Sequence, residues 1–249
     1  MKTIPKISAV LPVLFKADLI TQWRNRRAVM LSLLIPVIIL VAWKDLVGAM
    51  GGAFVLASCI TIGLNAIGLI GYPNSIARDR DKGVFQRLRI TPIPKWTIMC
   101  SRLVVQLFLI FLACTIVFIV GYFFADIKIS PIGYLLAYLT VTLGGIVYLG
   151  MGQVIVGLIS NPETVNSTGR LLYFVFFMVG MFGQTGMIGQ QLKEICGWSP
   201  YGTVQLILTA SMKPGIWDKT AAEAFLLTLV YAVSFATLGI KKFKWITKE

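Results

Sequence analysis

The sequence has no histidine, and its four cysteines are scattered without a CxxC pair. A chain without histidine cannot build a Ser/His/Asp triad, and isolated cysteines provide neither a zinc site nor a disulfide framework. Three of the cysteines fall within or beside apolar runs, where cysteine behaves as a small hydrophobic residue. We therefore predict no metal site and no catalytic residues on this chain.

The chain also lacks the motifs and charges from which a transporter could draw its own energy. It contains no GxxxxGK[ST] phosphate loop, so we predict no cofactor on the chain itself and no ATPase activity. Acidic and basic residues are nearly absent from the long apolar runs, which disfavours a proton-coupled transporter and an intramembrane hydrolase. If the protein transports, a partner must supply the energy.

What the chain does have is long apolar segments. Hydrophobic residues make up 57% of its 249 positions and charged residues 13%, whereas soluble domains carry about 25% charged residues. Uncharged runs of this length can cross a bilayer as helices. We predict an all-α polytopic membrane protein with a single domain over residues 1–249. The six predicted spans, within residues 28–240, are Ala28–Trp43, Gly51–Tyr72, Leu103–Phe124, Ile132–Ile159, Leu171–Ile188 and Ala221–Ile240.

The basic residues are distributed unevenly between the two sides of these spans. If both termini are cytoplasmic, the outer loops hold five of the 23 Lys and Arg residues, namely Lys44, Lys128, Lys193, Lys213 and Lys219. The positive-inside rule then predicts a multi-pass protein of the cell (inner or plasma) membrane, with both termini and the tail of residues 241–249 in the cytoplasm. The net charge of +13 reflects this topology and contact with anionic membrane lipid, and we expect no nucleic-acid partner.

A charged segment, ARDRDKGVFQRLRITPIP (residues 77–94), separates the second and third predicted spans. Acidic residues come first and basic residues last, which suits the dipole of a short helix, and two prolines prevent the helix from continuing. The pattern predicts an amphipathic helix that presents Val84, Phe85 and Leu88 as an apolar patch on the cytoplasmic face. A helix that merely lies against lipid is the alternative. The candidate residues of the segment are Asp79, Asp81, Gly83, Val84, Phe85, Arg87, Leu88 and Arg89.

Residues 1–27 form a second amphipathic segment before the first span. A helical wheel places Phe15, Leu19 and Trp23 on an apolar face and Asp18 on the opposite, polar face. A helix with a tryptophan and flanking basic residues is typical of the membrane interface. We predict an interfacial helix, which acts either as a simple anchor or as part of the functional machinery.

The fifth predicted span ends in GMFGQTGMIG, where glycines recur every three residues. Small residues at this spacing permit close backbone approach or a broken helix. The apolar segment Tyr201–Met212 that follows is too short to cross a bilayer, so we predict a re-entrant segment before the last span. This region is a candidate outer gate, with loose loop packing as the alternative. The candidate gate residues are Gly180, Gly183, Gly186, Gly189, Trp198 and Tyr201.

Uncharged polar residues and aromatic residues inside the spans are candidates for lining a translocation path. Polar side chains in spans more often form interhelical hydrogen bonds than contact a substrate. The aromatic residues suit an apolar or amphiphilic cargo, but they could also stack on sugars or face lipid. The candidate path-lining residues are Asn65, Gln153, Phe177 and Gln184.

The order of these features resembles the type-two permease family of ATP-binding-cassette exporters. The charged loop is similar to that family's E-x-x-x-G-T-x-E-x-L-x-x-x-P pattern, and WSPYGTV (residues 198–204) is similar to its NP-x-x-Y stretch. The loop matches at Gly83, Leu88 and Pro92, has Asp79 and Asp81 near the acidic positions, and departs at Val84 (usually Thr) and Gln86 (usually Glu).

This resemblance implies a half-transporter. Two copies would pair as a homodimer, or one copy would pair with a similar permease, over two cytoplasmic ATPase subunits that bind ATP and magnesium. The aromatic residues of the spans suit export of an amphiphilic cargo such as a lipid, drug or peptide. The charged loop would be the coupling helix that docks on the ATPase, and the interfacial helix would touch the ATPase as well. The alternatives are an exporter of a glycan or lipid-linked glycan and, in another class, a membrane scaffold or sensor subunit without a transport path.

Overall fold

The computed structural model describes residues 7–24, 26–89, 94–183, 189–213, 215 and 217–242. Within these ranges the chain is helical and contains no strand, which confirms the predicted all-α fold. The elements are α1 (Ile7–Arg24), α2 (Arg26–Ala42), α3 (Leu46–Met50), α4 (Gly52–Ala66), the π-helix η1 (Ile67–Gly71), α5 (Tyr72–Asp81), α6 (Val84–Arg89), α7 (Lys95–Phe124), α8 (Pro131–Leu158), α9 (Pro162–Met178), the π-helix η2 (Val179–Gly183), α10 (Gln190–Trp198), α11 (Pro200–Met212) and α12 (Lys219–Lys242).

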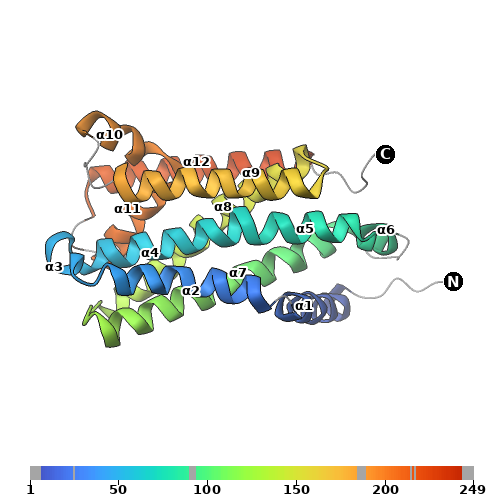
Figure 1. Ribbon diagram of the computed structural model, residues 1–249, viewed down its shortest axis with the longest axis horizontal. Coiled ribbons are helices and arrows are strands. Elements are labelled where there is room, and N and C mark those ends of the chain that lie inside the picture. Colours follow the sequence, from blue (N-terminus) through green and yellow to red (C-terminus); the bar gives the residue numbers. More distant parts are fainter. Residues whose placement is uncertain are drawn as a thin grey trace.

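Long helices run side by side and form an elongated bundle (Figure 1). α2 is 17 residues long, and it reaches the length of a span only together with α1, from which it is bent by 69°. Counted with this bent pair, the described chain has up to six candidate spans, which supports the predicted multi-pass architecture. The other five candidate spans are Gly52–Asp81, Trp96–Phe124, Pro131–Leu158, Pro162–Gly183 and Lys219–Lys242.

The two ends of the bundle carry different short elements (Figure 1). α6 and α1 lie at one end, which we call the α6 end, and α3 and α10 lie at the other, which we call the α10 end. Because successive long helices alternate in direction, α5 and α8 finish at the α6 end and α9 starts there.

The second span, formed by α4, η1 and α5, is the centre of the bundle. Every residue of α4 except Gly52 and Phe54 is buried. The α4 sequence is apolar on all sides and rich in small residues, so other helices can pack around it. In η1, a methyl group on Gly68 would lie 2.8 Å from the carbonyl carbon of Tyr148, so glycine is needed for α8 to pack this closely.

The fifth span starts earlier than the sequence prediction. α9 begins at Pro162 rather than at Leu171. The Asn161 side chain caps this helix by accepting hydrogen bonds from the backbone N–H groups of Glu163 and Thr164, and proline suits the first helical position. The first two turns of α9 are polar, so a search for apolar runs does not include them.

Two further spans also extend beyond their predicted boundaries, because their helices continue into polar turns. α7 begins at Lys95 rather than Leu103, and the second span continues past the predicted end of Gly51–Tyr72 as far as Asp81. In both cases the additional turns carry charged residues. The predicted end of the fifth span, Ile188, lies outside the described residues.

Between the fifth and last spans, α10 and α11 form a helical hairpin at the α10 end (Figure 1). Ser199 caps α11 by accepting a hydrogen bond from the backbone N–H of Gly202. α11 has 13 residues and is therefore about 20 Å long, shorter than the ~30 Å hydrocarbon core of a bilayer. It packs against α4, α8 and α12, and most of its residues are buried. The predicted short segment Tyr201–Met212 is thus a helix that enters the bundle without spanning it.

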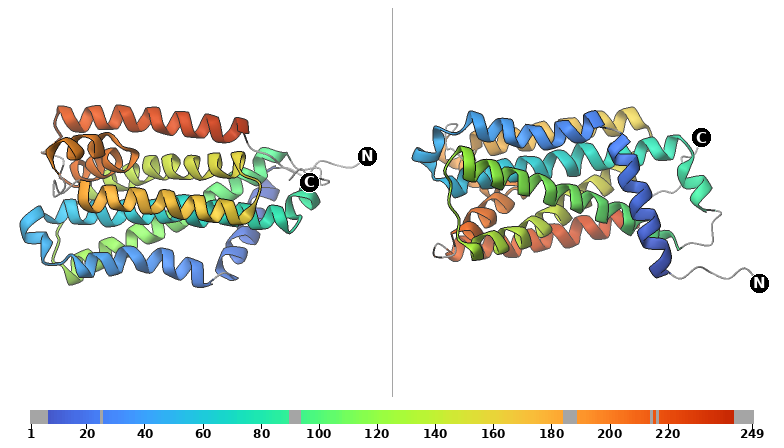
Figure 2. Two further views of the ribbon diagram at one scale, coloured as in Figure 1. Left: turned by 45° about the horizontal axis from the view of Figure 1, so that its top comes forward. Right: turned by 90° about the horizontal axis from the view of Figure 1, so that it is seen from below.

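α1 runs across the bundle rather than along it (Figure 2). One side of α1 packs on α7, while Val13 and Trp23 on its other side are 68% and 60% exposed. A helix that lies across the spans with exposed apolar side chains suits the membrane interface, as predicted for this segment.

Candidate functional site

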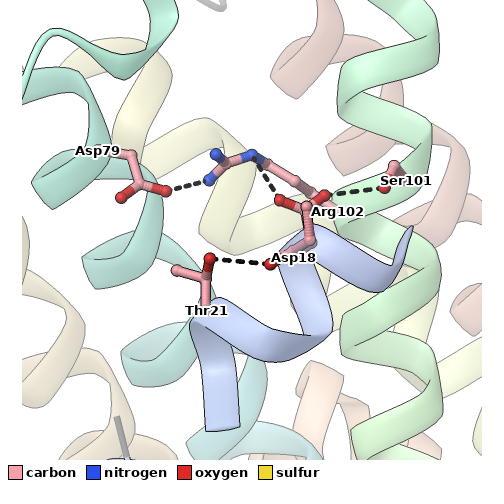
Figure 3. Close-up of polar contacts among 6 residues, drawn as sticks. Asp18, Thr21, Asp79, Ser101 and Arg102 are labelled. Carbon is pink, nitrogen blue, oxygen red and sulfur yellow. Dashed lines mark hydrogen bonds and ion pairs between the residues drawn. The ribbon is translucent and has the colours of Figure 1, made fainter. Parts of the chain in front are cut away.

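A buried ion pair lies at the α6 end, where Arg102 of α7 meets Asp79 of α5 (Figure 3). Nη1 of Arg102 lies 2.6 Å from Oδ2 of Asp79, and only 9% and 10% of the two side chains are exposed. A charge-assisted hydrogen bond of this length is strong, and pairing is what allows two charges to be buried. The ion pair fixes the end of the second span against the third.

Asp18 brings α1 to the same place (Figure 3). Its Oδ2 accepts a hydrogen bond of 2.8 Å from Oγ of Ser101, and its Oδ1 lies 3.9 Å from Nε of Arg102. Burial raises the pKa of the Asp18 carboxyl above its ordinary value, while the positive charge of Arg102 and the Ser101 hydrogen bond oppose this rise. These two α7 residues therefore hold the Asp18 carboxylate and tie α1 to the bundle.

α6 reaches the same arginine through Phe85. The Phe85 ring centre lies 4.8 Å from Cζ of Arg102, a cation–π contact, and Phe85 is 1% exposed. Gly83, with a φ of +68°, makes the turn between α5 and α6 that brings Phe85 back onto the bundle. We call Asp18, Asp79, Phe85, Ser101 and Arg102 the Arg102 cluster. This cluster joins α1, α5, α6 and α7.

The structure corrects the predicted position of the acidic residues in the charged segment. Asp79 and Asp81 end the helix of the second span, whereas the short helix of the loop starts only at Val84. Asp81 is exposed, and Asp79 is buried in the Arg102 cluster. The side chain of Arg89 and the whole of Pro92 lie outside the described part of the chain.

The predicted outward apolar patch on α6 is wrong. Phe85 points into the protein, and Val84 and Leu88 are half-buried. Gln86 and Arg87 are exposed instead, so α6 offers polar and charged side chains to its surroundings. The reason is that the Phe85 ring is buried in the apolar core of the bundle, where it also contacts the guanidinium of Arg102.

α1 contacts the rest of the protein more than expected for a helix that lies only on lipid. Phe15 packs edge-on against Phe108 of α7, with 6.4 Å between ring centres, and Leu19 is half-buried. Trp23 is exposed, as expected for the membrane interface. Asp18, predicted to lie on the polar face, points into the bundle. α1 therefore packs on the protein with parts of both its polar and its apolar face.

Arg80, the neighbour of Asp79, ties the second span to the fourth. Its guanidinium donates hydrogen bonds to the backbone carbonyl oxygens of Ile159 at 3.1 Å and Val156 at 2.5 Å. These carbonyls belong to the end of α8, where unpaired acceptors and the helix dipole both favour a positive charge. Consecutive residues of α5 thus hold two different helices.

At the α10 end, the structure brings several predicted gate residues together. Gly180 lies against the ring of Tyr201, and Gly183 lies against Cys196 of α10. Tyr201 is fully buried, and its hydroxyl donates a 3.2 Å hydrogen bond to the backbone carbonyl of Ser58. These contacts attach the α10–α11 hairpin to the fifth and second spans.

The remaining gate candidates are not part of that contact. Trp198 is exposed, and its backbone carbonyl accepts a 2.8 Å hydrogen bond from the hydroxyl of Tyr231. Gly189 precedes α10 with a φ of +120°. Gly186 and the path candidate Gln184 lie outside the described residues. A gating role for the whole set stays a prediction.

The other path candidates form contacts between helices. The Asn65 side chain donates a 3.2 Å hydrogen bond to the carbonyl of Tyr173, and Gln153 accepts a hydrogen bond from the hydroxyl of Tyr72. Phe177 is half-buried and stacks on Tyr173, with 6.2 Å between ring centres. Asn65 and Gln153 therefore act as interhelical hydrogen-bonding residues in this chain, and a path-lining role for these three stays a prediction.

The Arg102 cluster leaves little free space around it. A polar space of about 10 Å³, roughly the size of one water molecule, lies between α1, α5 and α7. Within the described ranges, no group of three or more Cys, Asp or Glu side chains is placed to hold a metal ion. The cluster therefore acts as a junction between helices and has no room for a cargo-sized ligand.

Arg102, Asp18 and Ser101 are site residues that the sequence pattern does not single out. A signal for Arg102 exists, because a charge near the end of an apolar run requires an acidic partner. The sequence alone offers several acids for that role, and only the folded position of α1 shows that Asp18 shares it with Asp79.

Comparison with known proteins links this architecture to membrane transport. The sequence pattern of the ABC-2 type transporter family matches residues 10–212 of the chain. A protein of Bacillus subtilis (strain 168) named "Putative transport permease YvfS" is 25% identical over 126 residues, which are 50% of this chain and 51% of that protein. The matched segment thus spans about half the length of this relative.

Proposed function

The chain belongs to the ABC-2 type transporter family, and on that premise we propose that it is the transmembrane subunit of an ATP-driven exporter. Membership of this family implies a partner ATP-binding-cassette ATPase. In this proposal ATP and magnesium bind to that partner, and the chain itself is not an enzyme. The similarity to a protein named as a transport permease supports the same conclusion.

The observation that carries the proposal is the Arg102 cluster, which connects α6 to three other helices. α6 lies at the tip of the bundle with Gln86 and Arg87 exposed, where an ATPase can dock (Figure 1). A displacement of α6 would move Phe85, and through Arg102 it would move α5, α7 and α1 together. The cluster is therefore the point at which ATPase motion enters the membrane domain.

The proposal places the α6 end in the cytoplasm and the chain in the cell membrane. Basic residues at the exposed ends of helices there, Arg87 on α6 and Lys241 and Lys242 on α12, follow the positive-inside rule. Exposed Trp23 on α1 suits the inner interface.

A second copy of the chain completes the translocation path in this proposal, and the cargo is amphiphilic. The fifth span supports both points, because only Val165 and Gly169 of α9 are buried within one copy. Large apolar side chains such as Leu171 and Phe174 remain exposed on the same helix and are available to a second copy. The α10–α11 hairpin would then close the outer side of the path.

Co-purification of the chain with its ATPase tests the docking surface. Arg87→Glu reverses an exposed charge on α6 and is expected to weaken ATPase association about tenfold or more, since a mismatched interfacial charge costs on the order of 1.4 kcal/mol or more. Lys193→Glu reverses an exposed charge on α10, at the opposite end, and should leave association unchanged. Full association of the Arg87→Glu variant would contradict docking through α6.

A further inference from the structure

A cavity of about 570 Å³ lies between α2, α9 and the second span. This volume is within the ~300–1,000 Å³ range of pockets for small organic ligands. Ile35 and Ile67 line it toward the middle of the bundle, and Arg78 and Glu163 line it toward the α6 end. Ile67 and Arg78 are about 16 Å apart along the helix axis, so the cavity has a polar mouth and an apolar floor.

Four polar residues line this cavity along the contact between α5 and α9. Asn74 and Arg78 are four residues apart on α5, and Asn166 and Arg170 are four residues apart on α9, so each pair lies on one helical face. The Asn74 side chain donates a 3.1 Å hydrogen bond to the Asn166 side chain, which sets the register of the two antiparallel helices. In that register Arg78 lies at the mouth, and Arg170 lies on the deeper side of the asparagine pair.

Arg170 is an exposed charge on the fifth candidate span. The sequence prediction, which starts the fifth span at Leu171, places Arg170 in the preceding loop. In the structure Arg170 lies within the candidate span Pro162–Gly183. Among the described residues, neither Arg170 nor Arg78 takes part in an ion pair, and the cavity's acidic residue, Glu163, is not at ion-pair distance from either. Two guanidinium groups that line one cavity and form no ion pair among the described residues are available to bind an anion.

We propose that this cavity receives the cargo from the inner leaflet as an anionic amphiphile, with a phosphate-type head group between Arg170 and Arg78 and a hydrocarbon tail toward Ile35 and Ile67. This inference rests on the proposed transport function and names the chemical class of its cargo. Guanidinium groups match phosphate oxygens in charge and geometry, and two arginines against one glutamate leave the lining net positive.

The cavity also borders the Arg102 cluster. Gln22, Ser75 and Gln106 line both the cavity and the small polar space beside Asp79 and Arg102. A cargo molecule in the cavity therefore contacts the helices that the cluster holds together. This contact gives the cargo a route by which to stimulate the ATPase.

Binding of short-chain lipids to the purified full-length chain tests the proposal. Native mass spectrometry in a neutral detergent would compare dioctanoyl phosphatidylglycerol, dioctanoyl phosphatidylcholine and inorganic phosphate. We expect the anionic lipid to bind about tenfold or more tightly than the zwitterionic lipid, and inorganic phosphate to bind more weakly than the anionic lipid because it lacks a tail. Equal binding of the two lipids, or of phosphate and anionic lipid, would overturn the proposal.

Variants locate the head group. Arg170→Gln, alone and with Arg78→Gln, should weaken binding of the anionic lipid by about tenfold or more, since a charge-assisted hydrogen bond is lost. Glu163→Gln removes the opposing charge and should tighten binding. Arg24→Gln neutralises an exposed arginine of α1 outside the cavity and should change nothing. Unchanged binding in the Arg78→Gln, Arg170→Gln variant overturns the site.

ATPase co-purification of the same variants separates this inference from the function on which it rests. Native mass spectrometry also reports whether the chain is a dimer. If the Arg170→Gln variant becomes monomeric and keeps its preference for anionic lipid, Arg170 stabilises the dimer and the inference is wrong. If the wild-type chain prefers the anionic lipid but never associates with an ATPase, the proposed function fails while the anionic site stands. If association is intact and the lipid preference is absent, only the inference fails.

Discussion

The α6 end and the α10 end of the bundle are held together by different chemistry. Among the described residues, the buried charged side chains are Asp79, Arg80 and Arg102, and all three lie at the α6 end. At the α10 end the buried polar contacts are between neutral groups, as where Nε2 of Gln205 donates a 2.5 Å hydrogen bond to Oγ of Ser58. The bundle thus confines its buried charges to the end that the proposed ATPase would move.

This difference separates two mechanical tasks. A buried charge pair is costly to break, because each partner is left without compensation, so helices joined in this way move together. Neutral hydrogen bonds are each worth about 1 kcal/mol and can be exchanged for others at small cost. The α6 end is suited to transmitting a displacement, and the α10 end is suited to opening.

Removing Arg102 should break the charged end and have the largest effect. Arg102→Ala leaves Asp79 buried without its counter-charge, so the free energy of unfolding should fall by about 3–5 kcal/mol. Unfolding of the purified chain in detergent, followed by tryptophan fluorescence, measures this change. The triple variant Arg102→Leu, Asp79→Asn, Asp18→Asn leaves neither carboxylate of the cluster without its counter-charge and should recover most of the loss. A single variant as stable as the wild type would show that the ion pair does not hold the α6 end.

Filling the glycine contact at the α10 end should have an intermediate effect. In Gly180→Ala the new methyl group meets the ring of Tyr201, and such overpacking should cost about 1–3 kcal/mol. Thermal unfolding measures the cost, and export should fall while ATPase association stays intact. Gly197→Ala on α10 is the matched control, because nothing lies within 4 Å of the added methyl group. Equal losses in the two variants would argue against a specific contact at Gly180.

Removing one hydroxyl at the α10 end should have the smallest effect. Tyr201→Phe deletes the hydrogen bond to the Ser58 carbonyl and should lower the free energy of unfolding by about 1 kcal/mol. Tyr231→Phe, which loses an exposed hydrogen bond of the same type to Trp198, should cost less. A loss for Tyr201→Phe as large as that for Arg102→Ala would mean that the two ends are held with equal strength.

Most of the fold is predictable from the sequence because the bilayer dictates it. Apolar runs of sufficient length identify the spans, and a run that is too short identifies α11. The errors fall where helices carry polar turns beyond the hydrocarbon core. The apolar run of the second span ends near Tyr72, yet α5 continues to Asp81, and Arg170 is assigned to a loop although it lies inside α9.

The candidate site is less predictable, because it depends on which elements meet. Spacing identifies the short helix α6 and places Phe85 on it. Spacing cannot show that the Gly83 turn folds this ring onto Arg102 rather than outward. Likewise, the polar face of α1 predicts contact with water unless the neighbouring arginine and serine of α7 are known.

η1 determines which neighbour each half of the second span meets. In this segment the N–H of Tyr72 bonds the carbonyl of Ile67, five residues back, so the turn holds one residue more than an α-helical turn. Successive residues of an α-helix are about 100° apart around the axis, so α5 is rotated by about that angle relative to an unbroken continuation of α4. With this phase offset, Asp79 faces α7 and Arg80 faces α8. Shortening η1 by one residue would turn both charges toward other neighbours without any change in the sequence of α5.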